Sequence, residues 1–515
     1  MLGPRKPYPP TELDLKVFET YVPYDHHLRK AARVINWDAF HDLLAPFYDD
    51  RLGQPSEPPV LMLQLEYLRY HYNLSDAQVI RRCQTDMAFR MFLQVNCHDQ
   101  LPDSSSLCRF RSRLKTEGFQ LIFDQVVAQA RRHGLIKERL RLKDATHIIA
   151  DIDVPTTLGL VAQIRDRLLE AARPFDRERV EGERVEIELL RQRTESQKVE
   201  LRLEARVTHL KEILSWVDTL PSPEDAETNK SWQKLLDRRR IAHKILDDQE
   251  HPGSGDQVRS VTDPDARRAK HGAWFDGYLL DMIVDPDSEI ITQINVLPGN
   301  GEEAADAITL IQQEEAVHGN DVEAISIDGI GFNGAVLHAL EDPEGLGLDA
   351  YVPPREGGED AMYTPRDFEE TEDGKLTCPA GQTSTSSWRD NARARRAHMF
   401  SADTCRGCAM VGQCMTDPPT ATAKHGRRVY RSDYHQELER ARAKSQTEQY
   451  KAVRREQWKV ERKLGEVMNC HGGRRARSRG QPKVFIQECM ASTATNIKRM
   501  IRLLCGERCA LASEN

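Results

Sequence analysis

The sequence predicts a mixed α/β protein that begins with a helical domain and carries two insertions. Helical patterns dominate residues 1–135, and strand-like runs at 274–285, 289–298 and 322–329 are separated by a helical stretch. Two other stretches differ from this plan: one is built of charged helical repeats and the other is irregular and rich in cysteine. The expected divisions are a helical domain (1–135), a first core strand (136–157), a helical insertion (158–255), an α/β core (256–355), a cysteine-containing insertion (356–449) and a final core helix with a basic segment (450–515).

Composition bounds the class of protein. The chain has 515 residues, of which 39% are hydrophobic and 30% charged, which suits about three domains with real cores. No apolar run approaches the length of about 18 residues that a membrane span needs, and the N-terminus lacks the apolar run of a signal peptide. We therefore expect a cytoplasmic protein without a membrane partner.

Charge is unevenly distributed along the chain. The formal net charge is −8, which does not by itself favour nucleic-acid binding. Residues 451–515, however, contain 15 Lys and Arg against 6 Asp and Glu. The densest patch is RRARSRG, with Arg474, Arg475, Arg477 and Arg479. Such a patch is either a solvated surface or a site of phosphate contact.

The N-terminal region reads as short helices joined by polar turns. Ser75 or Asp76 can cap one helix, and the stretch LPDSSSL starts another whose first turns carry Arg109, Arg111 and Arg113. Arginine-rich helix starts and short turns suit a helix-turn-helix arrangement that contacts DNA, although any small helical bundle has a similar pattern.

An acidic residue interrupts the first predicted strand. In RLRLKDATHIIADID, Asp144 alternates in phase with Leu140, Leu142, Thr146 and Ile148. A carboxylate on a buried face needs a partner, which is either a metal ion or an arginine. The alternative acids are Asp151 and Asp153, which lie on the opposite face of the strand.

Two further acids lie beside predicted core faces. Asp328 ends the apolar strand AISI, and the carboxyl ends of strands are where α/β sites assemble. Glu461 lies on a helix three and seven residues before Leu464 and Met468, so it borders the core-facing stripe. Alternatively, Asp328 caps the following helix and Glu461 pairs with Arg462 or Lys463 on the surface.

Three carboxylates suit one particular chemistry. Mg²⁺ and Mn²⁺ take oxygen ligands, and a pair of such ions can activate an attacking oxygen and stabilise a leaving oxygen in phosphodiester displacement. We therefore interpret Asp144, Asp328 and Glu461 as candidate metal ligands of a two-metal site.

The two insertions carry different signals. Leu and Val recur at three and four spacing in the helical insertion, which indicates an antiparallel helical bundle that serves oligomerisation, DNA clamping or structure alone. The second insertion contains Cys378, Cys405, Cys408 and Cys414, whose CxxC and flanking thiols suit a tetrahedral Zn²⁺ site, with His398 and His425 as possible substitutes. The alternative is four unrelated thiols.

Taken together, these segments resemble the DDE transposases of bacterial insertion sequences. The likeness lies in GQPSEPPVLMLQLEYLRYHYNLSDAQ, in LKDATHIIADI, in DPDARRAKHGAWFDGYLLDMIVDPDSEIITQINVLPGN, in ISIDGIGFNG and in VERKLGEV to RRARSRG. The resemblance implies an RNase H-like catalytic core with Asp144, Asp328 and Glu461 as catalytic metal ligands. It also implies double-stranded DNA partners (transposon ends and target), cleavage and strand transfer at terminal inverted repeats, and a homodimer or higher oligomer on nucleoid DNA.

The last acid has unusual surroundings for that family. Many relatives carry a Tyr, Arg, Glu, Lys arrangement around it, whereas here Gln457 and Trp458 precede Glu461 and Met468 follows it. Two other functions therefore stay open: a catalytically silent DNA-binding protein derived from a transposase, and a nuclease of the same fold that does not transpose.

Overall fold

The computed structural model describes residues 1–3, 10–49, 55–226, 229–253, 255–355 and 362–511, with side chains through residue 506. The chain forms two compact units. Unit 1 comprises Met1–Ile136, Ala145–Glu302 and Glu461–Asn515, and unit 2 comprises Lys137–Asp144 and Glu303–Val460. Strand β1 (Arg141–Ile149) belongs to both, because the division falls between Asp144 and Ala145.

Unit 1 begins with helices, as the sequence predicts. They are α1 (Glu12–Tyr21), α2 (His27–Val34), α3 (Ala39–Leu44), α4 (Pro59–His71), α5 (Asp76–Thr85), α6 (Met87–Leu93) and α7 (Ser104–Arg132). Ser75 caps α5 in a capping box with Gln78, and Asp103 caps α7 by accepting a hydrogen bond from the Ser106 amide. These polar side chains satisfy the first amides of the two helices and fix where each begins.

The long C-terminal helix α19 (Gln481–Leu511) packs against α7 and strand β4 (Ile291–Pro298). Its buried Asn496 accepts a hydrogen bond from the Ile291 amide and donates one to the Ile291 carbonyl, both at 2.8 Å. This side chain satisfies backbone groups of β4, which would otherwise be buried without partners.

The predicted hairpin is confirmed. Strands β3 (Ala273–Val284) and β4 pair antiparallel, with Tyr278 opposite Pro298. A further strand, β2 (Arg267–His271), pairs with β3, although it is not among the strand-like runs predicted from the sequence. It was not predicted because β2 is a largely exposed edge strand whose residues show no apolar alternation. Within unit 1 the strand order is β2-β3-β1, and β4 joins β3.

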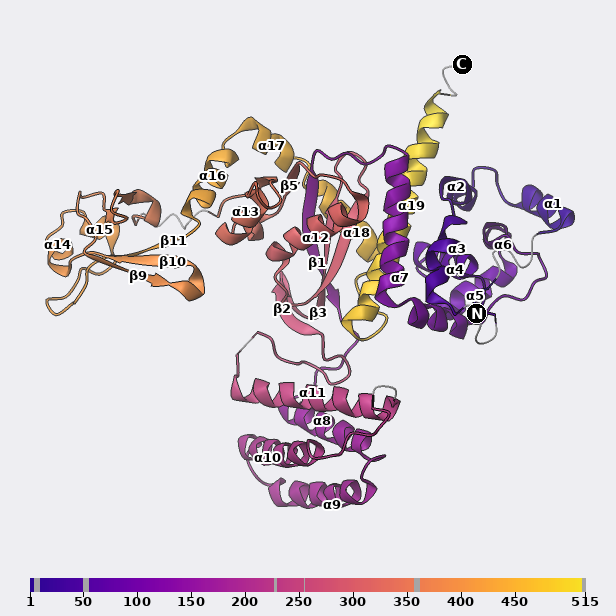
Figure 1. The fold of residues 1–515 in the computed structure, drawn as a ribbon, viewed down its shortest axis with the longest axis horizontal. Coiled ribbons are helices and arrows are strands. Elements are labelled where there is room, and N and C mark those ends of the chain that lie inside the picture. The colour runs from indigo at the N-terminus through magenta and orange to yellow at the C-terminus, as the bar shows by residue number, and fades with distance from the viewer. Residues whose placement is uncertain (4–9, 50–54, 227–228, 254, 356–361, 512–515) are drawn as a thin grey trace. The chain divides into compact units, whose positions relative to one another are not determined.

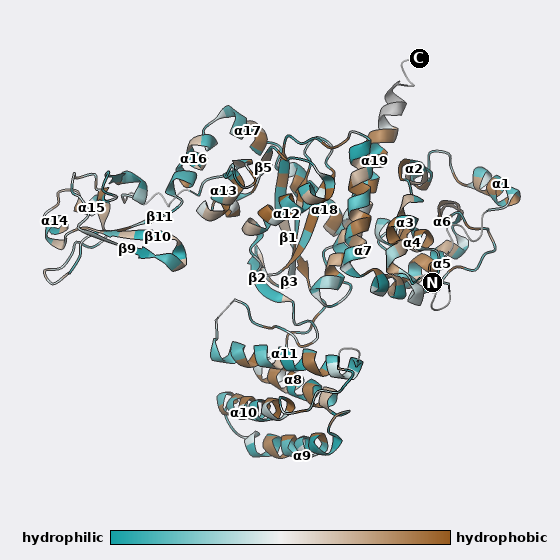
Figure 2. Cartoon of the chain, in the orientation of Figure 1, coloured by the Kyte–Doolittle hydropathy of each residue, from teal (hydrophilic) through white to brown (hydrophobic). Residues whose placement is uncertain are grey.

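The helical insertion is a four-helix arrangement. It contains α8 (Thr157–Ala172), α9 (Arg177–Thr194), α10 (Val199–Val217) and α11 (Lys230–Glu250), with α8 between α10 and α11 (Figure 1). Apolar residues occur on all four helices (Figure 2), and their buried members form one cluster that includes Ile164, Ile213 and Ile245. No helix in the described part of the chain is both long and apolar enough to cross a membrane.

Unit 2 is built on a parallel sheet. The first residues of β1 pair with β5 (Ala324–Ser326), which pairs with β6 (Asp349–Tyr351). Helices α12 (Glu303–His318) and α13 (Gly334–Glu341) connect these strands. The parallel pairs are β1–β5 and β5–β6, and the antiparallel pairs are β2–β3 and β3–β4. The sheet is therefore mixed, which confirms the mixed α/β class.

The cysteine-containing insertion is more regular than predicted. Its described residues form β7 (Glu369–Glu370), β8 (Leu376–Thr377), β9 (Ser386–Asp390), β10 (Arg395–Met399), β11 (Arg428–Ser432), α14 (Ala402–Arg406), α15 (Val411–Cys414) and α16 (His435–Ser445). These strands have five residues or fewer and contain few large apolar residues, so they leave little apolar signal in the sequence. Residues 356–361 lie outside the described residues. The Lys444 amine donates to the Ala350 carbonyl at 3.0 Å, so the insertion ends next to the strand from which it departs.

The last predicted core helix is two helices. Helix α17 (Glu448–Arg454) and helix α18 (Trp458–Cys470) are separated by three residues. Gln457 lies in the break and is buried, and its side chain bonds to backbone and side-chain groups of two strands. Those tertiary bonds explain the break, since helical periodicity alone continues through it.

Candidate active site

Two of the three candidate acids lie just beyond the paired residues of two neighbouring parallel strands. In the parallel pair of β1 and β5, Arg141 is opposite Ile325 and Leu142 is opposite Ser326. On its other side, β5 is followed by one further bond to β6, from the Ile327 amide to the Tyr351 carbonyl at 3.2 Å. Asp144 and Asp328 each lie two residues beyond the last paired residues, Leu142 and Ser326. Both acids lie in unit 2.

Asp328 is exposed and caps a 3₁₀ turn. One of its carboxylate oxygens, Oδ1, accepts a hydrogen bond from the Ile330 amide at 3.2 Å at the start of the turn Gly329–Gly331. The capping role considered from the sequence is therefore present. It orients the carboxylate at the end of β5 and leaves its open side facing solvent.

Asp144 is half-buried, and its strand neighbours on the other face carry buried charges. Arg141 is fully buried and donates to the fully buried Glu314 of α12 at 2.7 Å. Lys143 is buried as well, and its amine donates to the Glu303 carbonyl at 2.6 Å. The burial of Arg141 and Lys143 was not predicted, although RLRLK places cationic residues at alternating positions of a strand. Helix α12 thus packs against the face of β1 that carries Arg141 and Lys143. Asp144 alternates with these residues and so lies on the other face of the strand.

Gln457 joins the two acid-bearing strands, and Arg454 bonds to one of them. The Gln457 amide donates to the Lys143 carbonyl of β1 at 3.0 Å and accepts from the Ser326 hydroxyl of β5 at 2.8 Å. The Arg454 guanidinium donates to the Ile327 carbonyl at 2.8 Å, one residue before Asp328. These bonds hold the backbone next to each acid. The sequence indicated Gln457 only as a departure from a family pattern and did not indicate Arg454.

Glu461 lies in the first turn of α18 and is exposed, while Leu464 and Met468 are buried as expected. It therefore faces solvent more than the sequence predicts. The two cations considered as its surface partners bind other acids: Arg462 pairs with Glu289, and Lys463 donates to Glu466 at 2.9 Å. Glu461 is the first residue of the last stretch of unit 1.

The rival first acids are placed elsewhere. Asp151 and Asp153 follow the end of β1 and are exposed. The Arg479 guanidinium donates to the Asp151 carbonyl at 2.8 Å and lies 3.5 Å from its carboxylate. Neither acid is in the part of β1 that pairs with β5, which favours Asp144 as the neighbour of Asp328.

The basic segment after α18 is bonded to the far end of β1. The Ile149 amide donates to the Arg474 carbonyl at 3.0 Å, and the Ala476 amide donates to the Ile149 carbonyl at 2.9 Å. The Arg474 guanidinium donates to the His147 carbonyl at 2.6 Å, and Arg477 donates to the Leu74 carbonyl at 2.9 Å. Arg475 and Arg479 are exposed. The segment therefore contributes both internal bonds and outward-facing cations.

The arginines at the start of α7 likewise include one with internal bonds and two that are exposed. Arg111 is half-buried and donates to Glu66 at 2.5 Å and also to Asp76. Arg113 is exposed and stacks 4.6 Å from the Tyr48 ring centroid. Arg109 is exposed and lies 3.6 Å from Asp103. Arg111 thus links three helices of the N-terminal domain, and Arg109 and Arg113 remain accessible to solvent.

A buried acid beneath the basic segment makes stability pH-dependent. Burial raises the pKa of the Glu488 carboxyl on α19 to about 8, against the opposing charges of Arg477 and Arg474. Between about pH 4.5 and 8 the folded chain thus binds a proton that the unfolded chain has lost, so the free energy of unfolding falls as pH rises through this window. We expect Glu488→Gln to flatten that fall in urea unfolding measured across the window. An unchanged slope would show that other groups cause it.

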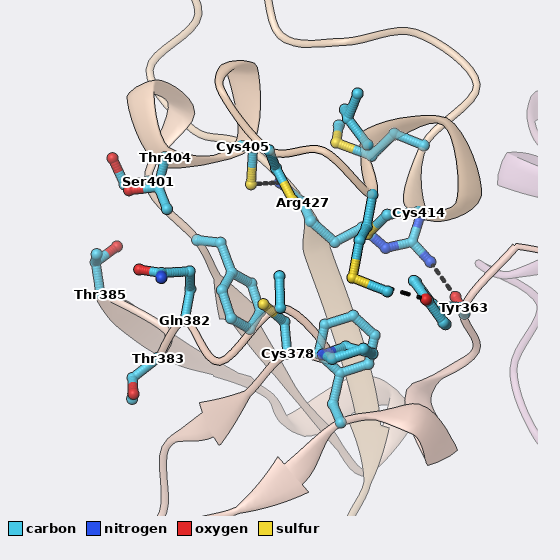
Figure 3. Close-up of a pocket in the computed structure, with 18 residues that line it drawn as sticks. Tyr363, Cys378, Gln382, Thr383, Thr385, Ser401, Thr404, Cys405, Cys414 and Arg427 are labelled. Atoms are coloured by element: carbon cyan, nitrogen blue, oxygen red, sulfur yellow. Dashed lines mark hydrogen bonds between the residues drawn. The ribbon is translucent and has the colours of Figure 1, made fainter.

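The four cysteines of the insertion line one cavity of about 210 Å³. Figure 3 shows Cys378, Cys405 and Cys414 around it, together with Arg427 and Tyr363. All four cysteines are free thiols. Burial raises the pKa of the Cys414 thiol, Arg427 lowers it, and the other three cysteines raise it further. His398 is on β10, buried and outside the lining of this cavity.

Among the described residues, no group of three or more His, Cys, Asp or Glu side chains is close enough to hold a metal ion as it stands. The aspartate pair is thus a partial donor set of carboxylate oxygens, the type that Mg²⁺ and Mn²⁺ bind. The thiols are a donor set of the type that Zn²⁺ binds.

Comparisons with known proteins found two family models. Residues 16–113 match a transposase domain (DUF772), and residues 377–501 match a transposase DDE domain. The second match includes Glu461 and the four cysteines. An uncharacterized protein, ORF8 in the nfe locus of Rhizobium meliloti, is 28% identical over 109 residues, which is 21% of this chain. The chain spans about half (52%) of that relative's length. No solved structure matches the chain.

Proposed function

With two transposase domains in one chain, the protein belongs to the DDE transposases of insertion sequences, and from that premise we propose that it cuts and joins DNA at the terminal inverted repeats of its element. The proposed core is RNase H-like, which agrees with the mixed sheet and with the DDE domain match. A homodimer or higher oligomer on double-stranded DNA would bring two transposon ends to one target.

The register of β1 against β5 is the observation that carries this proposal. Asp144 and Asp328 each lie two residues beyond the last pair of this register, in a chain with a DDE domain, which supports their assignment to one site. In the proposal, Asp144, Asp328 and Glu461 hold Mg²⁺ or Mn²⁺, which would polarise the scissile phosphate and lower the pKa of an attacking water or 3′-hydroxyl. Glu461 supplies the third carboxylate from the start of α18.

The positioning residues support this role for the two strands. Arg454 and Gln457 bond the backbone at Ile327 and at Lys143, next to each acid. Side chains that fix the backbone beside metal ligands reduce the reorganisation needed when the metal and DNA bind. The outward-facing cations Arg109, Arg475 and Arg479 are the proposed phosphate contacts, whereas the internal bonds of Arg111 and Arg477 give those residues a structural part as well.

Glu461→Gln tests the proposal directly. The substrate is DNA that carries the cognate ends, incubated with Mg²⁺, Mn²⁺ or chelator, with cut and joined products scored separately. We expect the wild type to form both products only with metal and Glu461→Gln to form neither, because glutamine keeps the shape of the side chain but removes the anionic oxygen. The matched control is Glu448→Gln, a first-turn glutamate of α17 that pairs with Lys451 and should retain both products.

The same assay separates the two other candidate functions. Cut product without joined product would identify a nuclease that does not transpose. Retention of end-specific binding with no product in either metal would identify a DNA-binding protein without catalysis. Full activity of Glu461→Gln would remove Glu461 from the site and leave the aspartate pair to be reassigned.

A further inference from the structure

The cysteine-containing insertion has a small apolar core. Its cluster of buried residues consists of Phe368, Leu376, Phe400 and Val429, and three cysteines pack against it. The surrounding strands have five residues or fewer, and two of them, β7 and β9, are almost entirely exposed. Segments with so little buried apolar surface are commonly stabilised by disulfides or by a metal ion. The insertion therefore needs a further source of stability.

Four thiols line one cavity beside this core. Cys378 follows β8, Cys405 lies in α14, Cys408 follows α14, and Cys414 ends α15. All four line one cavity, and Figure 3 shows the sulfur atoms of Cys378, Cys405 and Cys414 around it. Four polarizable sulfur atoms from three separate chain segments are the donor set of a closed tetrahedral site.

The backbone around these thiols suits thiolates. The Arg427 amide donates to the Cys405 sulfur at 3.4 Å, and a bond from an amide favours the charged form of a sulfur ligand. Gly426 makes this approach possible, because a Cβ there would lie only 2.5 Å from the same sulfur. The Gly381 amide closes a tight turn onto the Cys378 carbonyl at 2.8 Å, with a φ of +75° that favours glycine.

Arg427 supplies a compensating charge. Its guanidinium lines the cavity and donates to the Tyr363 carbonyl at 2.9 Å, which fixes it across the site (Figure 3). Four thiolates around one divalent ion leave a net negative charge, and a fixed guanidinium next to them lowers its electrostatic cost.

We propose that Cys378, Cys405, Cys408 and Cys414 bind one structural Zn²⁺, which cross-links β8, α14 and α15 of the insertion. Binding releases the thiol protons to solvent and draws the sulfur atoms from the cavity wall to about 2.3 Å from the metal. With all four positions taken by sulfur, no position is left for water, so the ion holds the fold rather than taking part in phosphodiester chemistry. The site is independent of the proposed carboxylate centre.

The test uses the full chain, purified without added metal and analysed for zinc by elemental mass spectrometry. We expect stoichiometric zinc in the wild type and its loss in Cys405→Ser and in Cys414→Ser. Cys108→Ser and Cys470→Ser are the matched controls, because these cysteines are exposed and lie outside the insertion, and they should keep the metal. Zinc retained in Cys405→Ser would overturn the site.

A spectroscopic readout keeps the test valid if a serine variant fails to fold. Chain reconstituted with Co²⁺ should show sulfur-to-cobalt charge transfer and intense visible bands of a tetrahedral thiolate site, and Cys414→His should shift those bands without abolishing them. Limited proteolysis should cut within 362–432 faster after chelation. A native chain without zinc whose four thiols react freely, or a disulfide among them found by non-reducing peptide mapping, would refute the proposal.

Discussion

Asp328→Asn is expected to abolish metal-dependent cleavage and joining while the protein stays folded. The substitution removes one anionic oxygen from the aspartate pair but keeps a side-chain oxygen that can accept the Ile330 amide bond. Metal ions stabilise the transition state of phosphodiester displacement by several kcal/mol, and each 1.4 kcal/mol, roughly, is tenfold in rate. We therefore expect the rate to fall by at least about a thousandfold.

The matched control is Asp342→Asn. The Asp342 carboxylate likewise accepts a hydrogen bond from a backbone amide two residues later, that of Glu344, at 3.0 Å. Asp342 follows α13 and is not part of β1 or β5. It should leave cleavage unchanged, and the melting temperatures of the two variants should be similar. Cleavage by Asp328→Asn at the wild-type rate would refute the assignment, and a lowered melting temperature in this variant alone would point to the cap instead of the metal.

Glu314→Ala should be the most destabilising single substitution of those considered. Glu314 and Arg141 are fully buried and bonded at 2.7 Å, so the alanine removes the main counter-charge of a guanidinium that has no access to solvent. Loss of one partner of a buried ion pair costs about 3–5 kcal/mol. Urea unfolding monitored by circular dichroism measures this change in the free energy of unfolding.

Two further variants test whether the uncompensated buried charge causes the loss of stability. The double variant Arg141→Met with Glu314→Leu should lose less stability than Glu314→Ala, because apolar replacement of both partners leaves no buried charge. Arg139→Ala breaks a partly exposed pair with Glu456 and should cost less than about 1 kcal/mol. If the double variant were less stable than Glu314→Ala, desolvation of the charge would not be the cause.

Much of the fold follows from local patterns. The β3–β4 hairpin was predicted because its strands are rich in apolar and β-branched residues around a turn, and α5 and α7 begin at the predicted caps. Strand β2 was missed because an exposed edge strand of polar residues carries no alternation. The break before α18 was missed because it depends on bonds from Gln457 to strands more than a hundred residues away.

The candidate site was predicted in part. Alternation placed Asp144 in phase with Leu142 and Ile148, which are buried, but only pairing with β5 relates Asp144 to Asp328. The sequence does not encode that register in any local pattern, since the partners are far apart along the chain. Likewise, the arginine-rich patterns predicted phosphate contacts without distinguishing Arg477, bonded to Leu74, from the exposed Arg475.

The bond between Lys444 and the Ala350 carbonyl has a consequence for engineering the chain. It means that the polypeptide leaves β6 and returns to the same strand after almost a hundred residues, so the insertion begins and ends next to β6. Replacing the part of the insertion between β6 and α16 by a short linker is therefore expected to keep the order and register of the sheet, because α16 and Lys444 stay in place. A shortened chain of this kind would let the contribution of the insertion to DNA selection be measured separately from catalysis.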